Sequence, residues 1–292
     1  MYQKSIGKQI WGIASPIIIY NAMVSLVQLI AGTICFVQHS EEIKQMEASF
    51  EEMQYAVLEL IANELADYVV IMMAIGAVLT IPILAHMMKK DRILKETLGI
   101  VPNNKAPISK YWLVAGISIP FALGTNNIVL FSNLAAYSEL YQETAEVFYA
   151  NDFIVQIVCL GVISPIVEEL IFRGLIYNRI KLGLKGSVPA MIISSFMFGF
   201  YHGNIVQTIY GCLSGLLLAY VYEKFGSIKA PILAHIVMNL VALILTEVNV
   251  FVWMFKDVTR MGVITVACAA IASSVFLLIK KIDEKPLKCE AE

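Results

Sequence analysis

The sequence is poor in charge, and this already excludes several classes of protein. Only 15% of the residues are charged and the formal net charge is −2. A soluble domain carries about a quarter charged residues, and a nucleic-acid-binding domain carries a basic excess on top of that. The composition therefore argues against an ordinary soluble domain and predicts no nucleic-acid partner.

Closely spaced cysteines are also missing. The five cysteines are odd in number and scattered, and no two of them form a CxxC pair. A disulfide framework or a thiolate zinc site needs such spacing, so neither is predicted. Four lie in apolar stretches, where a free cysteine behaves as a small hydrophobic residue. The fifth, Cys289, is followed by an acidic residue and makes a poor prenylation signal, so we expect a solvated tail there.

Long apolar segments are what the sequence has in abundance. Hydrophobic residues make up 59% of the 292, and the mean hydropathy is +0.74. A helix needs about 20 apolar residues to cross a bilayer. We therefore predict an all-α, polytopic membrane protein of about eight transmembrane helices, with a catalytic cavity inside the bundle. The predicted spans are 9–37, 68–88, 111–134, 153–177, 187–201, 205–222, 230–248 and 262–279.

The basic residues are distributed unevenly between the predicted loops. Most of the 21 lysines and arginines fall in the N-terminal segment, the second, fourth and sixth loops, and the C-terminal tail. Short cytoplasmic loops carry such an excess. The pattern predicts that both termini lie in the cytoplasm and that the first span is retained, because it is too long for a signal peptide's apolar core. If the source is prokaryotic, the membrane is the plasma membrane.

The predicted spans fall into three groups. Residues 1–152 hold the first three, with an acidic extracytoplasmic loop at about 39–67 and a basic cytoplasmic loop at about 89–110. The acidic loop has helical spacing, and we expect it to extend its neighbouring helices beyond the membrane. Residues 153–248 hold the expected catalytic core, and residues 249–292 hold the last helix and the tail.

The fourth predicted span carries three ionisable residues in close succession, Glu168, Glu169 and Arg173. Each charge at a bilayer centre costs about 2.5–3.5 kcal/mol on insertion scales, so such residues are candidates for function. Glu169 and Arg173 are four apart and can pair on one helix face, whereas Glu168 points about 100° away. Ser164 and Pro165 resemble an N-cap and a first helical position, so we expect a helix to restart there close to Glu168.

Two further spans add histidines. Phe198 and His202 are four apart at the end of the fifth span, and His235 and Asn239 are four apart in the seventh. Residues with this spacing share a helix face. A shielded carboxylate suits general-base work, while imidazole and amide groups donate hydrogen bonds to an oxyanion. Together with Glu168 and one water, these groups predict an amide-hydrolysing site that needs no nucleophilic serine or cysteine.

The same side chains also suit a metal. Two histidines and one carboxylate form a known catalytic zinc set, which here would be Glu168, His202 and His235. The sequence contains neither HExxH nor the Glu-x-x-His pattern of di-iron bundles. A site with one divalent metal such as zinc and a site with none both stay open at this point.

The linear positions of these residues set a condition on the fold. Glu168 and His235 lie about 16 Å and about 9 Å along their helices from the nearest cytoplasmic basic residue. The same distance for His202 is about 25 Å, which would place it near the opposite face of the membrane. For His202 to reach the others, the turn at 203–204 must lie inside the membrane, which is tolerated only where backbone lines a protein cavity. We predict a buried turn between the fifth and sixth helices.

Three motifs on three spans resemble those of one known family. They are Glu168-Glu169-x-x-x-Arg173, Phe198-x-x-x-His202 and His235-x-x-x-Asn239. In this order they are similar to the motifs of the CPBP family, also called Abi proteins, which are CAAX-processing and bacteriocin-processing intramembrane proteases and include the type II CAAX prenyl endopeptidases. The resemblance covers residues 153–248.

The resemblance implies eight helices around a cavity open to the cytosol and the bilayer. It implies that Glu168 activates water with help from His202, and that His235 and Asn239 stabilise the oxyanion. The pair of Glu169 and Arg173, with Phe198, would hold the site together. Members of the family have been described both as metalloproteases and as glutamate-dependent proteases, so the resemblance leaves the metal open too.

The expected function is that of an intramembrane endopeptidase. Its substrate would be a membrane-anchored peptide or protein, either prenylated and of CAAX type, or a bacteriocin or signal peptide. One alternative is a non-catalytic bacteriocin self-immunity or peptide-binding membrane protein, in which the polar cluster only recognises a peptide. A transporter ranks last, because no internal repeat relates the two halves of the sequence.

Overall fold

The computed structural model describes residues 5–45 and 49–282, and Cys289 with its tail lies outside these ranges. In the described part the chain is helical and contains no strand, which confirms the predicted all-α class. The long helices are α1 (Ile6–Gln38), α4 (Val69–Thr97), α5 (Trp112–Ser132), α11 (Ile205–Phe225), α12 (Lys229–Glu247) and α14 (Val258–Lys280). One more long helix runs from Phe153 to Leu184 and is described with the site.

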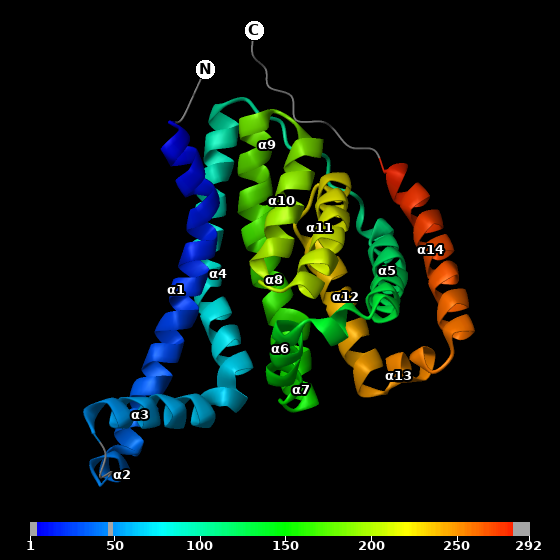
Figure 1. Ribbon diagram of the computed structural model, residues 1–292. Coiled ribbons are helices and arrows are strands. Elements are labelled where there is room, and N and C mark those ends of the chain that lie inside the picture. The colour runs from blue at the N-terminus through cyan, green and yellow to red at the C-terminus, as the bar shows by residue number, and fades with distance from the viewer. Residues whose placement is uncertain (1–4, 46–48, 283–292) are drawn as a thin grey trace.

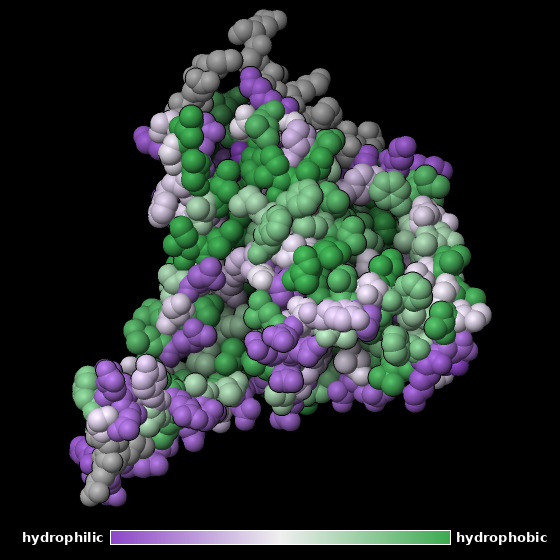
Figure 2. Space-filling view, viewed as in Figure 1, coloured by the Kyte–Doolittle hydropathy of each residue, from purple (hydrophilic) through white to green (hydrophobic). Residues whose placement is uncertain are grey.

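Seven helical segments in the described ranges are long and apolar enough to cross a membrane, and α10 (Ser187–Tyr201) is apolar but has only 15 residues. The protein is an integral, multi-pass membrane protein. Its eight apolar helices match the eight predicted spans. Side chains over the middle of the bundle are mostly hydrophobic, and hydrophilic ones gather towards its lower end (Figure 2). The division at residues 152 and 248 stays a prediction.

The helices stand side by side, and the start of α1 lies at the same end of the bundle as the end of α14 (Figure 1). This arrangement is what an even number of crossings requires. The core is centred on the long helix 153–184, where Ile171, Phe172, Leu175 and Ile176 are buried. The side chains of Glu169 and Arg173 on this helix have no exposure, so these two charged residues are enclosed by protein.

Helices α10 and α11 form a tight antiparallel hairpin because small residues face one another. A Cβ on Gly211 would lie 2.9 Å from the Cα of Gly199, and a Cβ on Gly215 would lie 2.9 Å from the Cα of Ser195. Two small residues four apart on each helix let backbones approach closely, which is how membrane helices gain packing energy without a hydrophobic driving force. The predicted buried turn at 203–204 is found only in part, because Asn204 is 4% exposed whereas Gly203 is exposed.

Two local expectations are wrong. The acidic loop forms α2 (Ser40–Lys44), α3 (Phe50–Leu65) and the 3-10 turn η1 (Ala66–Tyr68), and α3 lies across the ends of α1 and α4 instead of extending them (Figure 1). Ser164 is not an N-cap, because it has helical φ and ψ of −58° and −51° within a continuous helix. The polar residues 124–127 do not interrupt α5, because Thr125 and Asn126 bond to carbonyls of its preceding turn.

The remaining short elements complete the chain. The polar segment between α5 and the long helix forms η3 (Leu134–Tyr137) and the amphipathic α6 (Glu139–Tyr149). Helix α13 (Val250–Phe255), which the sequence did not predict, joins α12 to α14. The 3-10 turn η2 (Ile108–Lys110) precedes α5.

Candidate active site

The two glutamates lie on a short α-helical piece between two π-helical pieces. The long helix consists of α7 (Phe153–Gln156), the π-helix η4 (Ile157–Ile163), α8 (Ser164–Glu169), the π-helix η5 (Leu170–Tyr177) and α9 (Asn178–Leu184). π-Helical turns inside α-helices are rare and often occur at functional sites, because they rotate side chains and free backbone groups. The two π segments therefore set the direction in which the glutamate side chains point.

Pro165 explains part of the first π segment. A π-helical hydrogen bond would run from the N–H of residue 165 to the carbonyl of Leu160, but proline has no N–H. Instead, the Nδ2 of Asn239 on α12 donates to the Leu160 carbonyl at 2.9 Å. A buried carbonyl needs a donor, so Asn239 satisfies the backbone that Pro165 leaves open. Its second amide hydrogen is not used by this bond.

Arg173 connects three helices in the interior. It is fully buried and pairs through Nη1 with Oε1 of Glu169, which is also fully buried, at 2.8 Å. Its Nη2 donates to the carbonyl of Gly215 on α11 at 3.1 Å, and its guanidinium lies 4.6 Å from the ring centroid of Phe198 on α10. Within the described residues, Oε2 of Glu169 and Nε of Arg173 have no hydrogen-bond partner. The predicted Glu169–Arg173 pair is thus present, and Arg173 ties it to the α10–α11 hairpin.

His235 lies between the two glutamates. Its Nδ1 is 2.9 Å from Oε1 of Glu169, and its Nε2 is 3.7 Å from Oε2 of Glu168. Because Glu169 is paired with Arg173, its carboxylate only accepts hydrogen bonds, so Nδ1 of His235 carries the proton that is donated to it. This assignment leaves Nε2 facing Glu168 across a gap that is slightly longer than a direct hydrogen bond.

The two neighbouring glutamates differ in accessibility. The side chain of Glu168 is 13% exposed, whereas that of Glu169 has no exposure. Glu168 accepts a hydrogen bond from the hydroxyl of Ser164 at 2.8 Å, one helical turn earlier on the same face. One carboxylate is therefore held in a closed ion pair, and the other is open on one side.

His202 reaches the same neighbourhood through the ring of Phe198. The centroid of that ring lies 5.0 Å from the imidazole of His202 and 5.6 Å from the imidazole of His235, and the Phe172 ring lies 5.0 Å away. Nδ1 of His202 is 2.8 Å from the Phe198 carbonyl, and because a carbonyl only accepts, Nδ1 donates and Nε2 keeps its lone pair. The two imidazoles thus pack on one aromatic ring with the same tautomer.

Helix α1 adds residues that the sequence analysis did not single out. Tyr20 is buried in the same hydrophobic core as Val167 and Ile171 of the long helix. Tyr201 donates from its hydroxyl to Oδ1 of Asn21 at 3.3 Å, which links α1 to the end of α10. No motif spacing relates α1 to the site, so only the three-dimensional packing reveals these residues. The bond from Ser164, by contrast, follows from its position four residues before Glu168.

The predicted residues are brought together with one difference. Glu168, Glu169, Arg173, Phe198, His202 and His235 form a connected set around the Phe198 ring and the His235 imidazole. Asn239 lies on the same helix as His235 but directs an amide N–H to the Leu160 carbonyl. Its expected role in oxyanion binding stays a prediction.

The donor set does not form a metal site as placed. Within the described ranges, no three side chains of His, Cys, Asp or Glu are grouped as a metal ion would require. Nδ1 of His235 donates to Glu169 and Nδ1 of His202 to a backbone carbonyl, which leaves both Nε2 lone pairs free, as in metal-ligating histidines, but the three side chains are not gathered around one point. The alternative with a metal on Glu168, His202 and His235 would need these side chains to move together, so we derive no chemical step through a metal.

Comparison with known proteins agrees with the motifs. Residues 150–241 match the model of a family described as type II CAAX prenyl endopeptidase Rce1-like. A curated relative from Bacillus subtilis (strain 168), named "Putative membrane peptidase YdiL", is 27% identical over 177 residues, which cover 58% of this chain and 70% of that protein. No solved structure matches the chain. The resemblance predicted from the three motifs is confirmed: residues 150–241 of this membrane protein match the Rce1-like family model, and the chain is similar to a putative membrane peptidase.

Proposed function

We propose that the protein is an intramembrane endopeptidase in which Glu168 activates a water molecule. The observation that carries the proposal is the different environment of two adjacent acids. Glu169 is closed off by Arg173 and His235, while Glu168 is partly exposed and faces the free nitrogen of His235 at 3.7 Å. A general base must reach its water and must not be held in an ion pair. Of the two acids, Glu168 meets both conditions.

The gap between Glu168 and His235 is suited to a shared water. A polar separation beyond about 3.5 Å is commonly bridged by water, and both groups present acceptor atoms towards it. The water oxygen would form a bond to the carbonyl carbon of the peptide while its proton moves to Glu168. The carbon–nitrogen bond then breaks as Glu168 returns that proton to the leaving amine, which gives a carboxylic acid and an amine with no covalent enzyme intermediate.

Three groups are available to stabilise the charge on the carbonyl oxygen. The second amide hydrogen of Asn239 is free of the Leu160 bond, and the Nε2 atoms of His202 and His235 can each donate when protonated. Donors of this kind act most strongly in a site shielded from water. Glu169 would position His235 without touching the substrate.

The substrate we propose is a membrane-associated peptide. The family description and the name of the Bacillus relative concern membrane peptidases, and the site lies among helices that also contact lipid. Tyr201, the neighbour of His202 in the chain, is bonded to Asn21 on α1, and both residues are at least partly exposed. A peptide anchored by a lipid or by a transmembrane segment would reach the site from this side.

The experiment compares membrane peptides from cells that carry either the native protein or the Glu168→Gln variant. Peptides that end at new cleavage sites should be present with the native protein and absent with the variant. Glu143→Gln is the matched control, because Glu143 is an exposed acid on α6, and this variant should give the native pattern. Prenylated substrates and signal or bacteriocin peptides would be distinguished by the masses of the fragments.

The same variants separate the alternatives. A non-catalytic immunity or peptide-binding protein would keep its phenotype with Glu168→Gln, and no fragment would depend on Glu168. A transporter would change the distribution of its solute without producing any fragment. Identical fragments from the native protein and the Glu168→Gln variant, with equal amounts of inserted protein, would overturn the proposal.

A further inference from the structure

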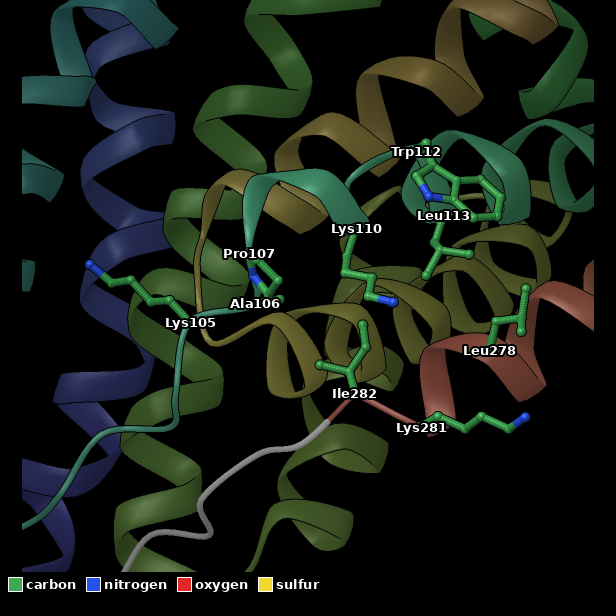
Figure 3. Close-up of a pocket in the computed structure, with 9 residues that line it drawn as sticks. All are labelled: Lys105, Ala106, Pro107, Lys110, Trp112, Leu113, Leu278, Lys281 and Ile282. Atoms are coloured by element: carbon green, nitrogen blue, oxygen red, sulfur yellow. The ribbon is translucent and has the colours of Figure 1, made fainter.

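A cavity at one end of the bundle combines positive charge with an apolar floor. It has a volume of about 280 Å³ and lies between the start of α5 and the end of α14 (Figure 3). Leu113 and Ile282, both buried, form its floor. The other lining residues that matter here are Trp112, Lys105, Lys110 and Lys281, and among the residues that the structure describes no acidic side chain lines it.

Of the three lysines, Lys110 points across this cavity, whereas the side chains of Lys105 and Lys281 stand at its edges and point outward (Figure 3). None of the three forms an ion pair with a described residue. By contrast, Lys181 at the same end of the bundle is paired with Glu223. The cavity therefore has positive charge that no described acid compensates.

The segment that carries two of the lysines is fixed to the bundle. The N–H of Ala106 donates to the carbonyl of Phe225 at 3.0 Å, and Nδ2 of Asn103 donates to the carbonyl of Glu223 at 2.9 Å. The ring of Tyr111 packs edge-on against the Phe225 ring at 5.3 Å. Anchoring at both sides holds the segment in place before any ligand arrives, which lowers the entropic cost of binding.

The cavity lies at the level where two membrane spans end. The candidate spans Ile108–Ser132 and Val258–Lys280 begin and end beside it. Trp112 is exposed there, and tryptophan is enriched at the boundary between headgroups and hydrocarbon. Next to it, the outer faces of α5 and α14 expose large apolar residues such as Ile119 and Leu277, where acyl chains would lie.

We infer that this cavity binds the phosphate headgroup of an anionic phospholipid. Basic pockets between transmembrane helices are known to favour anionic lipid headgroups. A soluble phosphate offers the same charge, but it has no chain to lie against the exposed apolar faces of α5 and α14. The lipid uses both the lysines and the apolar surface. The inference concerns lipid binding only and does not depend on peptidase activity.

The test uses Trp112 as a local probe of the bound lipid. With Trp11→Phe and Trp253→Phe, Trp112 is the single remaining tryptophan. The protein is reconstituted into phosphatidylcholine vesicles that contain phosphatidylglycerol, with brominated chains on one lipid or the other. Brominated phosphatidylglycerol should quench Trp112 more strongly than its share of the membrane predicts. Each lysine close to an anionic lipid contributes about fivefold in affinity, so the triple variant Lys105→Gln, Lys110→Gln, Lys281→Gln should weaken binding by at least about tenfold.

The control removes the same charge elsewhere. Lys89, Lys90 and Lys229 are exposed and do not line the cavity, so their replacement by glutamine should keep the excess quenching. Lys110→Gln alone should weaken binding by about fivefold, which keeps the test decisive if the triple variant fails to fold. The inference is overturned by quenching in proportion to composition, by an equal loss in the control variant, or by displacement of the lipid with soluble glycerol phosphate.

Discussion

The long helix 153–184 contributes to two groups of polar residues, each completed by a residue of a neighbouring helix, and the two groups differ in how their hydrogen bonds are satisfied. The site cluster, towards the middle of the helix, consists of Glu168, Glu169, Arg173 and His235. The basic-end cluster, one to three turns further along, is centred on Glu223, whose two carboxylate oxygens bind the ammonium of Lys181 and the hydroxyl of Tyr177. In the same region, Lys95 of α4 donates to Asn178, which in turn donates to the hydroxyl of Tyr222.

The two clusters differ in whether the polar atoms of their charged side chains all have hydrogen-bond partners. At the basic end, both oxygens of the one buried carboxylate have donors. In the site cluster, Glu169 and Arg173 each keep one buried polar atom without a partner, and Glu168 is open to one side. Buried polar groups are normally satisfied, and exceptions ask for an explanation. The comparison suggests that the basic-end cluster fastens helices together, and that the site cluster gives up some stability for reactivity.

Replacing Arg173 should have the largest effect on stability. Arg173→Met would leave the Glu169 carboxylate charged and buried without a cation, and breaking a buried pair in this way costs about 3–5 kcal/mol. The variant should be poorly folded, as measured by the loss of helical signal on heating in detergent.

A double variant of the Glu169–Arg173 pair distinguishes the effect of the pair on stability from its effect on activity. Glu169→Gln with Arg173→Met removes both charges, and replacement of a whole buried pair is often nearly neutral. Stability should largely return, but activity should not, because His235 loses the carboxylate that orients it. Recovery of cleavage in the double variant would contradict the orienting role of Glu169.

In the basic-end cluster, a substitution should lower stability and leave activity unchanged, which is the reverse of the result expected for the double variant. Lys181→Met leaves the Glu223 carboxylate with only its tyrosine donor, and we expect a loss of about 2–3 kcal/mol, because this pair is slightly exposed and less costly to break than a fully buried one. Cleavage per folded molecule should stay at the native level. A large fall in that specific activity would show that the two clusters are coupled.

A change in the α10–α11 hairpin should disturb the site cluster from outside. Gly211→Ala would bring a methyl group to 2.9 Å from the Cα of Gly199, and overpacking of this kind costs about 1–3 kcal/mol. Because the hairpin carries Phe198 and His202, activity should fall with it. Gly262→Ala on α14 is the control, since no atom lies within 4 Å of its new Cβ. Equal stability and activity in both variants would contradict the close packing.

The smallest effect is expected at Ser164. Ser164→Ala removes one hydrogen bond to the Glu168 carboxylate, which is worth about 1 kcal/mol when the group is partly exposed. Cleavage should fall about fivefold while the midpoint of thermal unfolding stays close to native. Ser164→Thr keeps the hydroxyl and should restore most of the rate.

The sequence was sufficient for much of this picture. Apolar runs of bilayer length located the helices, because hydrophobic burial in lipid depends on composition and length. The i, i+4 spacing of Glu169 and Arg173 predicted their ion pair, because helix geometry is fixed. The position of His202 near the end of its helix predicted a buried turn at 203–204, of which Asn204 is buried and Gly203 is exposed.

Other features depend on contacts between distant segments. The first π segment and Pro165 leave the Leu160 carbonyl to Asn239, and no local propensity predicts that this partner comes from another helix. The bond from Tyr201 to Asn21 joins residues 180 positions apart. The direction of α3 follows from its packing against α1, not from its own amphipathic pattern. Spacing along one helix can be derived from sequence, but the partners across helices cannot.

The central claim is that Glu168, and not its neighbour, activates the water. It is tested most directly by the cleavage rate of purified Glu168→Gln protein in vesicles, with a peptide substrate identified from the membrane peptides and with the fraction of folded protein measured in parallel. Loss of a general base lowers the rate by about 10²–10⁴-fold, so we expect cleavage at least about a hundredfold below native with the folded fraction unchanged. Cleavage at the native rate in that variant would contradict the account.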